Sequence, residues 1–166
     1  MIRFESKDDR EAVRNVHASA FEGHTEVKLF ALLNEQARPL VSLLAEEEDE
    51  CVGHILFSPA SLHGHPDLNI MGLAPMSVLP GYQGQGIGSA LVREGLDQCR
   101  KQGVDAVIVL GHPDYYPRFG FRPAARYGIE SEYEVPDEAF MVLELQPGVL
   151  QGRSGRVEYH PAFKQL

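Results

Sequence analysis

The sequence has no long apolar run and few cysteines. Its longest apolar stretches, such as residues 106–110, are far shorter than the roughly 20 residues of a membrane-spanning helix. The first ten residues, MIRFESKDDR, lack the apolar core of a secretory signal. We therefore expect a cytoplasmic protein with no membrane partner. Its two cysteines, Cys51 and Cys99, form no metal or redox spacing and are expected to be reduced thiols in the core.

Basic residues are also in short supply. Lys and Arg number 15 against 24 Asp and Glu, which gives a formal net charge of −9. A nucleic-acid-binding protein exposes a basic face, so this balance argues against nucleic acid as a partner. An anionic ligand would have to be held by local backbone dipoles, whereas a cationic acceptor would be mildly favoured. The acidic run at 46–50 is interpreted as a solvated hairpin turn, and the turn at 63–67, with two histidines but no third ligand nearby, favours no metal site.

What the chain does contain is the patterning of one mixed α/β domain. We expect a single domain over 1–166, with 147–166 as a C-terminal extension packed on it. Apolar residues at helical spacing predict helices, and short apolar or β-branched runs predict strands. The helices are expected within 12–21, 25–33 and 87–99, and the strands at 2–5, 40–45, 51–58, 68–79, 104–110 and 140–145, with shorter pieces from Phe121 and at 157–159. Proline removes a ladder donor, so an interruption is expected near Pro75–Ser77.

The segment LAPMSVLPGYQGQGIG at 73–88 carries the most information. It reads as an apolar strand, a Pro-Gly break and glycines that open a helix. Glycine adopts positive φ and lets backbone approach a ligand closely. A helix N-terminus adds free N–H groups and the positive end of the helix dipole. The segment therefore predicts a phosphate or pyrophosphate site.

The residues narrow the choice of ligand. A P-loop needs Gly-Lys-Ser/Thr, and no lysine follows these glycines. A dinucleotide fingerprint needs glycine at 89, where Ser89 stands, and usually follows the first strand of its fold. A tight turn without any ligand is the remaining alternative from the glycines alone.

The loop resembles the coenzyme A pyrophosphate signature of the GNAT superfamily of N-acetyltransferases, Q/R-x-x-G-x-G/A. The hexapeptide QGQGIG at 83–88 fits every position, and VLPGY at 78–82 resembles the usual V-x-P-x-Y/W lead-in. A second family feature, a tyrosine four residues ahead of a Gly-Phe pair, is matched by Tyr116. The stretches HPDYYPRFGF and FMVLEL further resemble a branch of predicted bacterial acetyltransferases whose acceptors are mostly unknown. The likeness covers roughly residues 1–145.

This resemblance implies an α/β (α+β) fold with a mixed, mostly antiparallel central sheet of about seven strands. Helices would cover both faces, and two central strands would splay apart. It implies acetyl-CoA as co-substrate, no metal, and transfer of the acetyl group to the primary amine of a small molecule or peptide by direct attack on the thioester. The cofactor-binding residues that it implies are Met76, Ser77, Val78, Gln83, Gly84, Gln85, Gly86, Ile87 and Gly88.

The resemblance also makes Tyr116 the acid that protonates the departing thiolate, since a phenol of pKa about 10 suits a leaving group of comparable basicity. Its neighbour Tyr115 is assigned to packing. The alternative function is a non-catalytic acyl-CoA-binding sensor or scaffold; a nicotinamide-dependent oxidoreductase is a third. The C-terminal segment is a candidate surface for a homodimer. The general base stays open among Glu22, Glu26, His54, His112 and Asp114.

Overall fold

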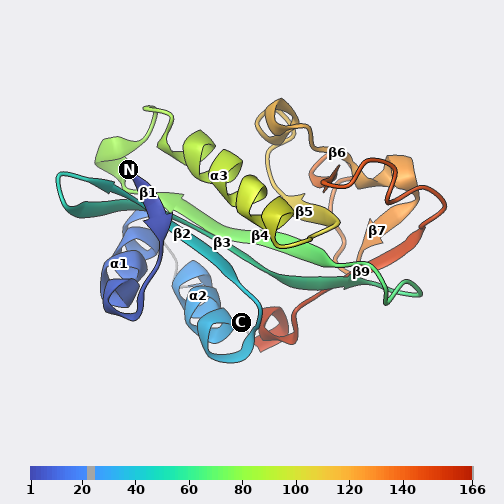
Figure 1. The fold of residues 1–166 in the computed structure, drawn as a ribbon, viewed down its shortest axis with the longest axis horizontal. Helices are drawn as coiled ribbons and strands as arrows, with labels where there is room; N and C mark the ends of the chain where they lie inside the picture. The colour runs from blue at the N-terminus through green and yellow to red at the C-terminus, as the bar shows by residue number, and fades with distance from the viewer. Residues whose placement is uncertain (22–24, 166) are drawn as a thin grey trace.

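A computed structural model describes residues 1–21 and 25–165. A nine-stranded sheet runs through the centre, with α1 and α2 on one face and α3 on the other (Figure 1). The predicted fold class, a mixed and mostly antiparallel sheet between helices, is confirmed. The count of about seven strands implied by the family resemblance was wrong: the described residues form nine, including pieces of only two and three residues.

The elements follow one another in an order close to the prediction. The α-helices are α1 (Arg10–Ala20), α2 (Thr25–Gln36) and α3 (Ile87–Lys101). The strands are β1 (Ile2–Phe4), β2 (Val41–Glu47), β3 (Glu50–Leu62), β4 (Ile70–Val78), β5 (Ala106–Leu110), β6 (Arg122–Pro123), β7 (Ile129–Ser131), β8 (Phe140–Glu144) and β9 (Gly155–Tyr159). Short 3-10 helices are η1 (Lys7–Asp9), η2 (Pro80–Tyr82), η3 (Tyr116–Phe119), η4 (Ala124–Tyr127) and η5 (Pro161–Gln165).

The strands lie in the order β1-β2-β3-β4-β5-β8-β6, and β9 extends the sheet by pairing with the end of β3 and with β7. Among the strands of the described residues, only β4–β5 and β7–β9 pair in parallel. The acidic run forms the turn of the β2–β3 hairpin, as interpreted, with Glu48 and Asp49 at positive φ. The C-terminal segment contributes β9, a five-residue strand that includes the predicted piece at 157–159.

The splayed pair consists of β4 and β5. They pair only from Ile70 opposite Ala106 to Gly72 opposite Ile108. Beyond that point β4 continues to Val78 with β3 on one side, while no strand of the described chain pairs with its other edge. Main-chain groups along this edge are therefore free of the ladder hydrogen bonds that a closed sheet would require.

Pro75 does not break β4 but lies in a β-bulge. The register against β3 passes from Leu73 opposite Phe57 to Met76 opposite Ile55. Ala74 and Pro75 together therefore oppose one residue of β3, as two residues do in a bulge. The predicted irregularity is present at the predicted place, and the strand continues through it.

Close packing fixes each helix against the sheet. On one face, α3 lies so near β3 that a Cβ at Gly95 would be 2.3 Å from the Phe57 ring. On the other face, α1 contacts β3 and β4, and Val13 packs with Leu56 in the same buried cluster. A capping box between Ser6 and Asp9 begins the turn that leads into α1.

Candidate functional site

The glycine loop after β4 presents a row of unused backbone donors. Gly84 and Gly86 have φ of +77° and +85°, a conformation that residues with a side chain adopt only with strain. The first backbone bond into α3 runs from the Ala90 N–H to the Gly86 carbonyl, at 3.0 Å. Within the described chain, the N–H groups of residues 84–89 donate to no protein acceptor. These donors and the helix dipole suit an anionic ligand.

Side chains of the same loop hold its shape. The Gln83 side-chain amide donates to the Val78 carbonyl at 2.9 Å, which ties the loop to the end of β4. The Gln85 amide reaches the Gly81 carbonyl at 3.5 Å. The Gln83 side chain therefore supports the backbone shape of the loop.

A pocket of about 350 Å³ opens against this loop. Six of the nine predicted cofactor residues line it: Val78, Gln83, Gly84, Gly86, Ile87 and Gly88. Four further lining residues were not predicted: Tyr82, Ser89, Tyr115 and Arg118. Gln85 instead lines a neighbouring hollow beside β1. Met76 stands close by, its methyl carbon 3.9 Å from where a Cβ of Gly88 would lie.

Tyr115 does more than pack. Its ring contacts the core, as predicted, but its hydroxyl also hydrogen-bonds the Ser89 hydroxyl at 3.0 Å in the pocket wall. The guanidinium of Arg118 lies over the Tyr115 ring, 4.5 Å from its centroid, which places a cation at the pocket. Sequence reasoning missed this role because the family pattern selects only Tyr116.

Tyr116 is 8% exposed and packs against the turn that follows β5. A Cβ at Gly111 would be 2.3 Å from its ring, so glycine is required there. Burial raises the pKa of Tyr116 to about 12, so the hydroxyl keeps its proton at neutral pH. Only Glu5, Ser58 and Tyr159 have fully enclosed side-chain oxygens without a partner in the described chain. The Tyr116 hydroxyl is not among them and has no hydrogen-bond partner in the described chain, and Tyr116 does not line the loop pocket.

The Ser77 side chain faces away from the loop pocket. Its hydroxyl lies 2.6 Å from Nδ1 of His17 on α1. His54, one of the predicted base candidates, is the cross-strand neighbour of Ser77 and is fully buried. Burial, together with His17, holds the pKa of His54 well below its usual 6.5. His17 was not predicted, since nothing in the local sequence relates α1 to β3 and β4.

The other base candidates lie elsewhere. His112 and Asp114 are exposed on the turn after β5, and Glu26 is half-buried on α2. None of the three lines the loop pocket. Glu22 lies outside the described residues.

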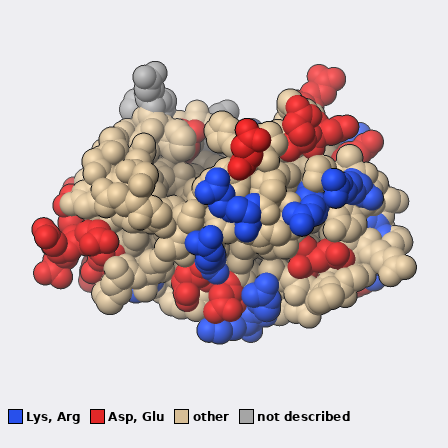
Figure 2. Space-filling view, turned by 90° about the horizontal axis from the view of Figure 1, so that it is seen from above, with Lys and Arg blue, Asp and Glu red and all other residues tan. Residues whose placement is uncertain are grey.

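The α3 face carries charges of both signs. Lys and Arg side chains lie across its middle, with acidic side chains below and to the right of them, and a further acidic group marks the β2–β3 hairpin at the left (Figure 2). Arg93, Arg100 and Lys101 belong to α3, and Arg118 belongs to η3. In the part of the chain that the structure describes, no helix is long and apolar enough to cross a bilayer.

Splayed parallel strands beside a glycine-opened helix N-terminus make an arrangement suited to a phosphate-bearing ligand. The sequence profile of the acetyltransferase (GNAT) family matches residues 10–121. The chain belongs to this family.

Similar proteins and solved structures support the same family assignment. The uncharacterised N-acetyltransferase YjhQ of Escherichia coli K12 is 43% identical over 88% of this chain and 86% of its own length. YhbS of the same organism, also uncharacterised, is 36% identical over 100% of this chain and 99% of its own. A crystal structure of E. coli YhbS in complex with CoA superposes with a TM-score of 0.92 at 35% identity, covering 99% and 91% of the two chains. A Brucella melitensis GNAT-family acetyltransferase in complex with acetyl-CoA gives a TM-score of 0.80 at 35% identity, covering 98% and 97%.

Proposed function

We propose that this protein is an N-acetyltransferase that moves the acetyl group of acetyl-CoA to the primary amine of a small molecule or peptide. The observation that carries the proposal is the row of free N–H groups at 84–89, beside the unpaired edge of β4. Family membership and the CoA and acetyl-CoA complexes of the two structural relatives support the choice of ligand.

The residues present fit coenzyme A. No atom lies within 4 Å of the place where a Cβ at Gly84 or Gly86 would stand, so a ligand can approach the backbone there. The loop N–H groups would hold the pyrophosphate, and Arg118 would add a positive charge at the pocket. Main-chain groups at Met76, Ser77 and Val78 would bind the pantetheine arm and polarise the acetyl carbonyl.

The reaction is direct aminolysis of the thioester. The amine nitrogen bonds to the acetyl carbon, the carbon–sulfur bond breaks, and the thiolate leaves as CoA thiol after taking a proton. The Tyr116 hydroxyl would donate to that sulfur. Burial raises the pKa of this phenol to about 12, so the hydroxyl stays protonated and available to donate its proton as the thiolate departs.

A second function is favoured by one observation. The pocket wall contains no carboxylate and no imidazole among the described residues. A protein that only binds acyl-CoA, as a sensor or scaffold, would need no group there to accept a proton from an amine. This non-catalytic module is therefore the competing proposal.

Two measurements separate these functions. Acetyl-CoA at 100 times its dissociation constant should stabilise the protein by about 2.7 kcal/mol, seen as a higher melting temperature, whereas NADH should not. Free thiol should then be released with some member of a panel of small-molecule and peptide amines. A melting temperature unmoved by millimolar acetyl-CoA contradicts both proposals. A shift without thiol release from any amine favours the sensor.

A further inference from the structure

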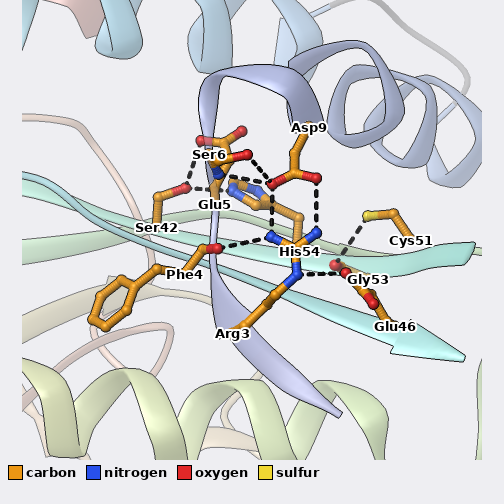
Figure 3. Close-up of polar contacts among 10 residues, drawn as sticks. All are labelled: Arg3, Phe4, Glu5, Ser6, Asp9, Ser42, Glu46, Cys51, Gly53 and His54. Atoms are coloured by element: carbon orange, nitrogen blue, oxygen red, sulfur yellow. Dashed lines mark hydrogen bonds and ion pairs between the residues drawn. The ribbon is translucent and has the colours of Figure 1, made fainter. Parts of the chain in front are cut away.

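A continuous row of hydrogen bonds crosses the sheet between α1 and strands β2 to β4. It begins at the Ser77 hydroxyl, 2.6 Å from Nδ1 of His17. Nε2 of His17 lies 2.9 Å from Nδ1 of His54. Nε2 of His54 lies 2.7 Å from the Ser42 hydroxyl, which donates to Oε1 of Glu5 at 2.9 Å. Figure 3 shows the last part of this row, with Ser42 between Glu5 and the His54 ring. We call these five side chains the relay row.

The number of protons that each side chain carries decides which group donates in each hydrogen bond of the row. The Ser42 hydroxyl donates to the Glu5 carboxylate, so its lone pair accepts from Nε2–H of His54. A neutral imidazole carries one proton, so Nδ1 of His54 accepts from Nε2–H of His17. Nδ1 of His17 then accepts from the Ser77 hydroxyl. All four donors therefore point from Ser77 toward Glu5.

The two ends of the row differ in a way that suits proton movement. Ser77 lies on the splayed part of β4, where the thioester is proposed to bind, and its side chain is on the α1 face, opposite the loop pocket. Glu5 is half-buried, and its second oxygen, Oε2, is enclosed with no partner in the described chain. The charged groups facing Glu5 are Arg10 and Asp9. Burial is the larger influence and raises the pKa of Glu5, which makes its carboxylate a readier proton acceptor.

The middle of the row holds no lasting charge. His17 and His54 are both 0% exposed, and burial lowers the pKa of His17 to about 4. An imidazolium would be costly there, so the rings favour passing a proton along over storing it.

We propose that the relay row is the proton exit of the acetyltransferase: Ser77 receives a proton from the acceptor amine, and Glu5 takes up the proton that emerges at the far end. The inference rests on the proposed function, because it needs an amine beside the splayed strand. It supplies the base that the pocket wall lacks. Ser77 is the only member that touches the amine, directly or through a water; the other four act through it.

The protons balance as follows. An ammonium acceptor must lose two protons to become an amide. The first goes to Ser77 while the hydroxyl proton of Ser77 moves to His17, and successive shifts through His54 and Ser42 protonate Glu5. The free amine attacks, and its second proton leaves with the thiolate as CoA thiol. Because the hydroxyls and imidazoles must return to their starting arrangement between turnovers, we expect the row to influence kcat more than the KM of acetyl-CoA.

The first test removes the acceptor at the end of the row. Glu5→Gln should lower kcat by about 10- to 100-fold, while leaving acetyl-CoA binding and melting temperature near wild type. Its remaining rate should rise by about one logarithmic unit per pH unit where the wild type is flat, since the amine must then lose its proton to solvent. The matched control is Glu46→Gln, which removes a carboxylate paired with Arg3 on the same side of the sheet without touching the row. If Glu5→Gln instead has the kcat and the pH profile of the wild type, the relay is overturned, but the proposed acetyltransferase function still stands.

A second pair of variants guards against a general loss of structure. Ser42→Thr keeps the hydroxyl, and Ser42→Val has the shape of the threonine side chain without its hydroxyl. Threonine should restore most of the activity that valine loses. Equal rates in the two variants would show that the hydroxyl passes no proton.

A third measurement needs no acceptor at all. Nitrogen-15 NMR of the two buried histidines should find the proton on Nε2 in both rings. A proton on Nδ1 of either neutral ring reverses the direction of the row and overturns the relay, whether or not the enzyme turns over. If instead both protons are on Nε2 but wild type acetylates no amine of the panel, it is the proposed function that fails.

Discussion

Nε2 of His17 lies 2.9 Å from Nδ1 of His54, which joins two fully buried imidazoles from different elements of the fold. Their rings stand edge to face, and the Phe30 ring of α2 packs against both. This apolar enclosure allows hydrogen bonding between the neutral rings but opposes protonation of either. The arrangement has a consequence for stability as well as for proton transfer.

Acidification should destabilise the fold through these histidines. Burial lowers the pKa of His17 to about 4 and holds the pKa of His54 well below 6.5. Between pH 6.5 and 4 the unfolded chain binds protons that the folded chain does not, so the stability present above pH 6.5 is lost as the pH falls. For His17 alone the loss approaches about 3 kcal/mol. Urea unfolding from pH 7.5 to 4.5 measures it.

Glu5 changes the free energy of unfolding in the opposite direction, because its raised pKa lets the folded chain bind a proton before the unfolded chain as the pH falls. Two sets of variants separate the histidine effect from that of Glu5. A His17→Gln, His54→Gln double variant should flatten the pH slope, whereas His63→Gln, at an exposed turn, should keep it. An unchanged slope in the double variant would contradict the assignment.

Gly86→Ala should weaken coenzyme binding. Gly86 and Gly64 share a φ of +85° with open space around them, so alanine strains either backbone by about 1 to 2 kcal/mol. Only Gly86 belongs to the phosphate loop. We expect Gly86→Ala and Gly64→Ala to lower stability alike, and only Gly86→Ala to raise the dissociation constant of acetyl-CoA, by about tenfold. Isothermal titration decides; equal affinities would remove the loop from the cofactor site.

Tyr116→Phe should reduce kcat by about 10²- to 10⁴-fold with little change in acetyl-CoA binding. Tyr133→Phe is the matched control, since it removes a tyrosine hydroxyl outside the loop pocket. The pKa of about 12 also predicts no loss of activity from Tyr116 ionisation up to pH 10. A Tyr116→Phe rate within about threefold of wild type is too small a loss for an acid at the leaving group.

Gly95→Ala should destabilise the protein, although alanine is the better helix former by about 1 kcal/mol. The added Cβ would meet the Phe57 ring at 2.3 Å, and such overpacking typically costs about 1 to 3 kcal/mol. A Phe57→Leu change in the same chain should recover part of the loss. Urea unfolding measures each variant, and a net gain in stability for Gly95→Ala would show that α3 can move away from β3.

The sequence predicts best those elements of the fold whose conformation depends on residues close together in the chain. Helical spacing located α1 and α3, and the glycines located a loop with positive φ and free N–H groups. The family motif selected Tyr116 but gave no reason to expect Tyr115 in the pocket wall, since neighbouring tyrosines on a short turn differ only in tertiary contacts.

The parts it could not predict depend on distant packing. His17, His54 and Ser77 meet only because α1 crosses β3 and β4, and no spacing in the chain encodes that crossing. Likewise β7 is too short for a hydrophobic period, so its pairing with β9 creates it.

The bulge at Pro75 decides which chemistry each face of β4 offers. Before it, Met71 and Leu73 point into the core beneath α3. After it, the phase has advanced by one residue, so that Met76 packs on that side and Ser77 meets α1. An unbulged strand would exchange them, turning a thioether toward the histidines and a hydroxyl into the apolar core. The one extra residue in the bulge therefore decides which side chains of β4 face α1. Deleting Pro75 should turn Ser77 away from His17 and so remove it from the relay row, although every residue of the row and of the loop pocket would still be present in the chain.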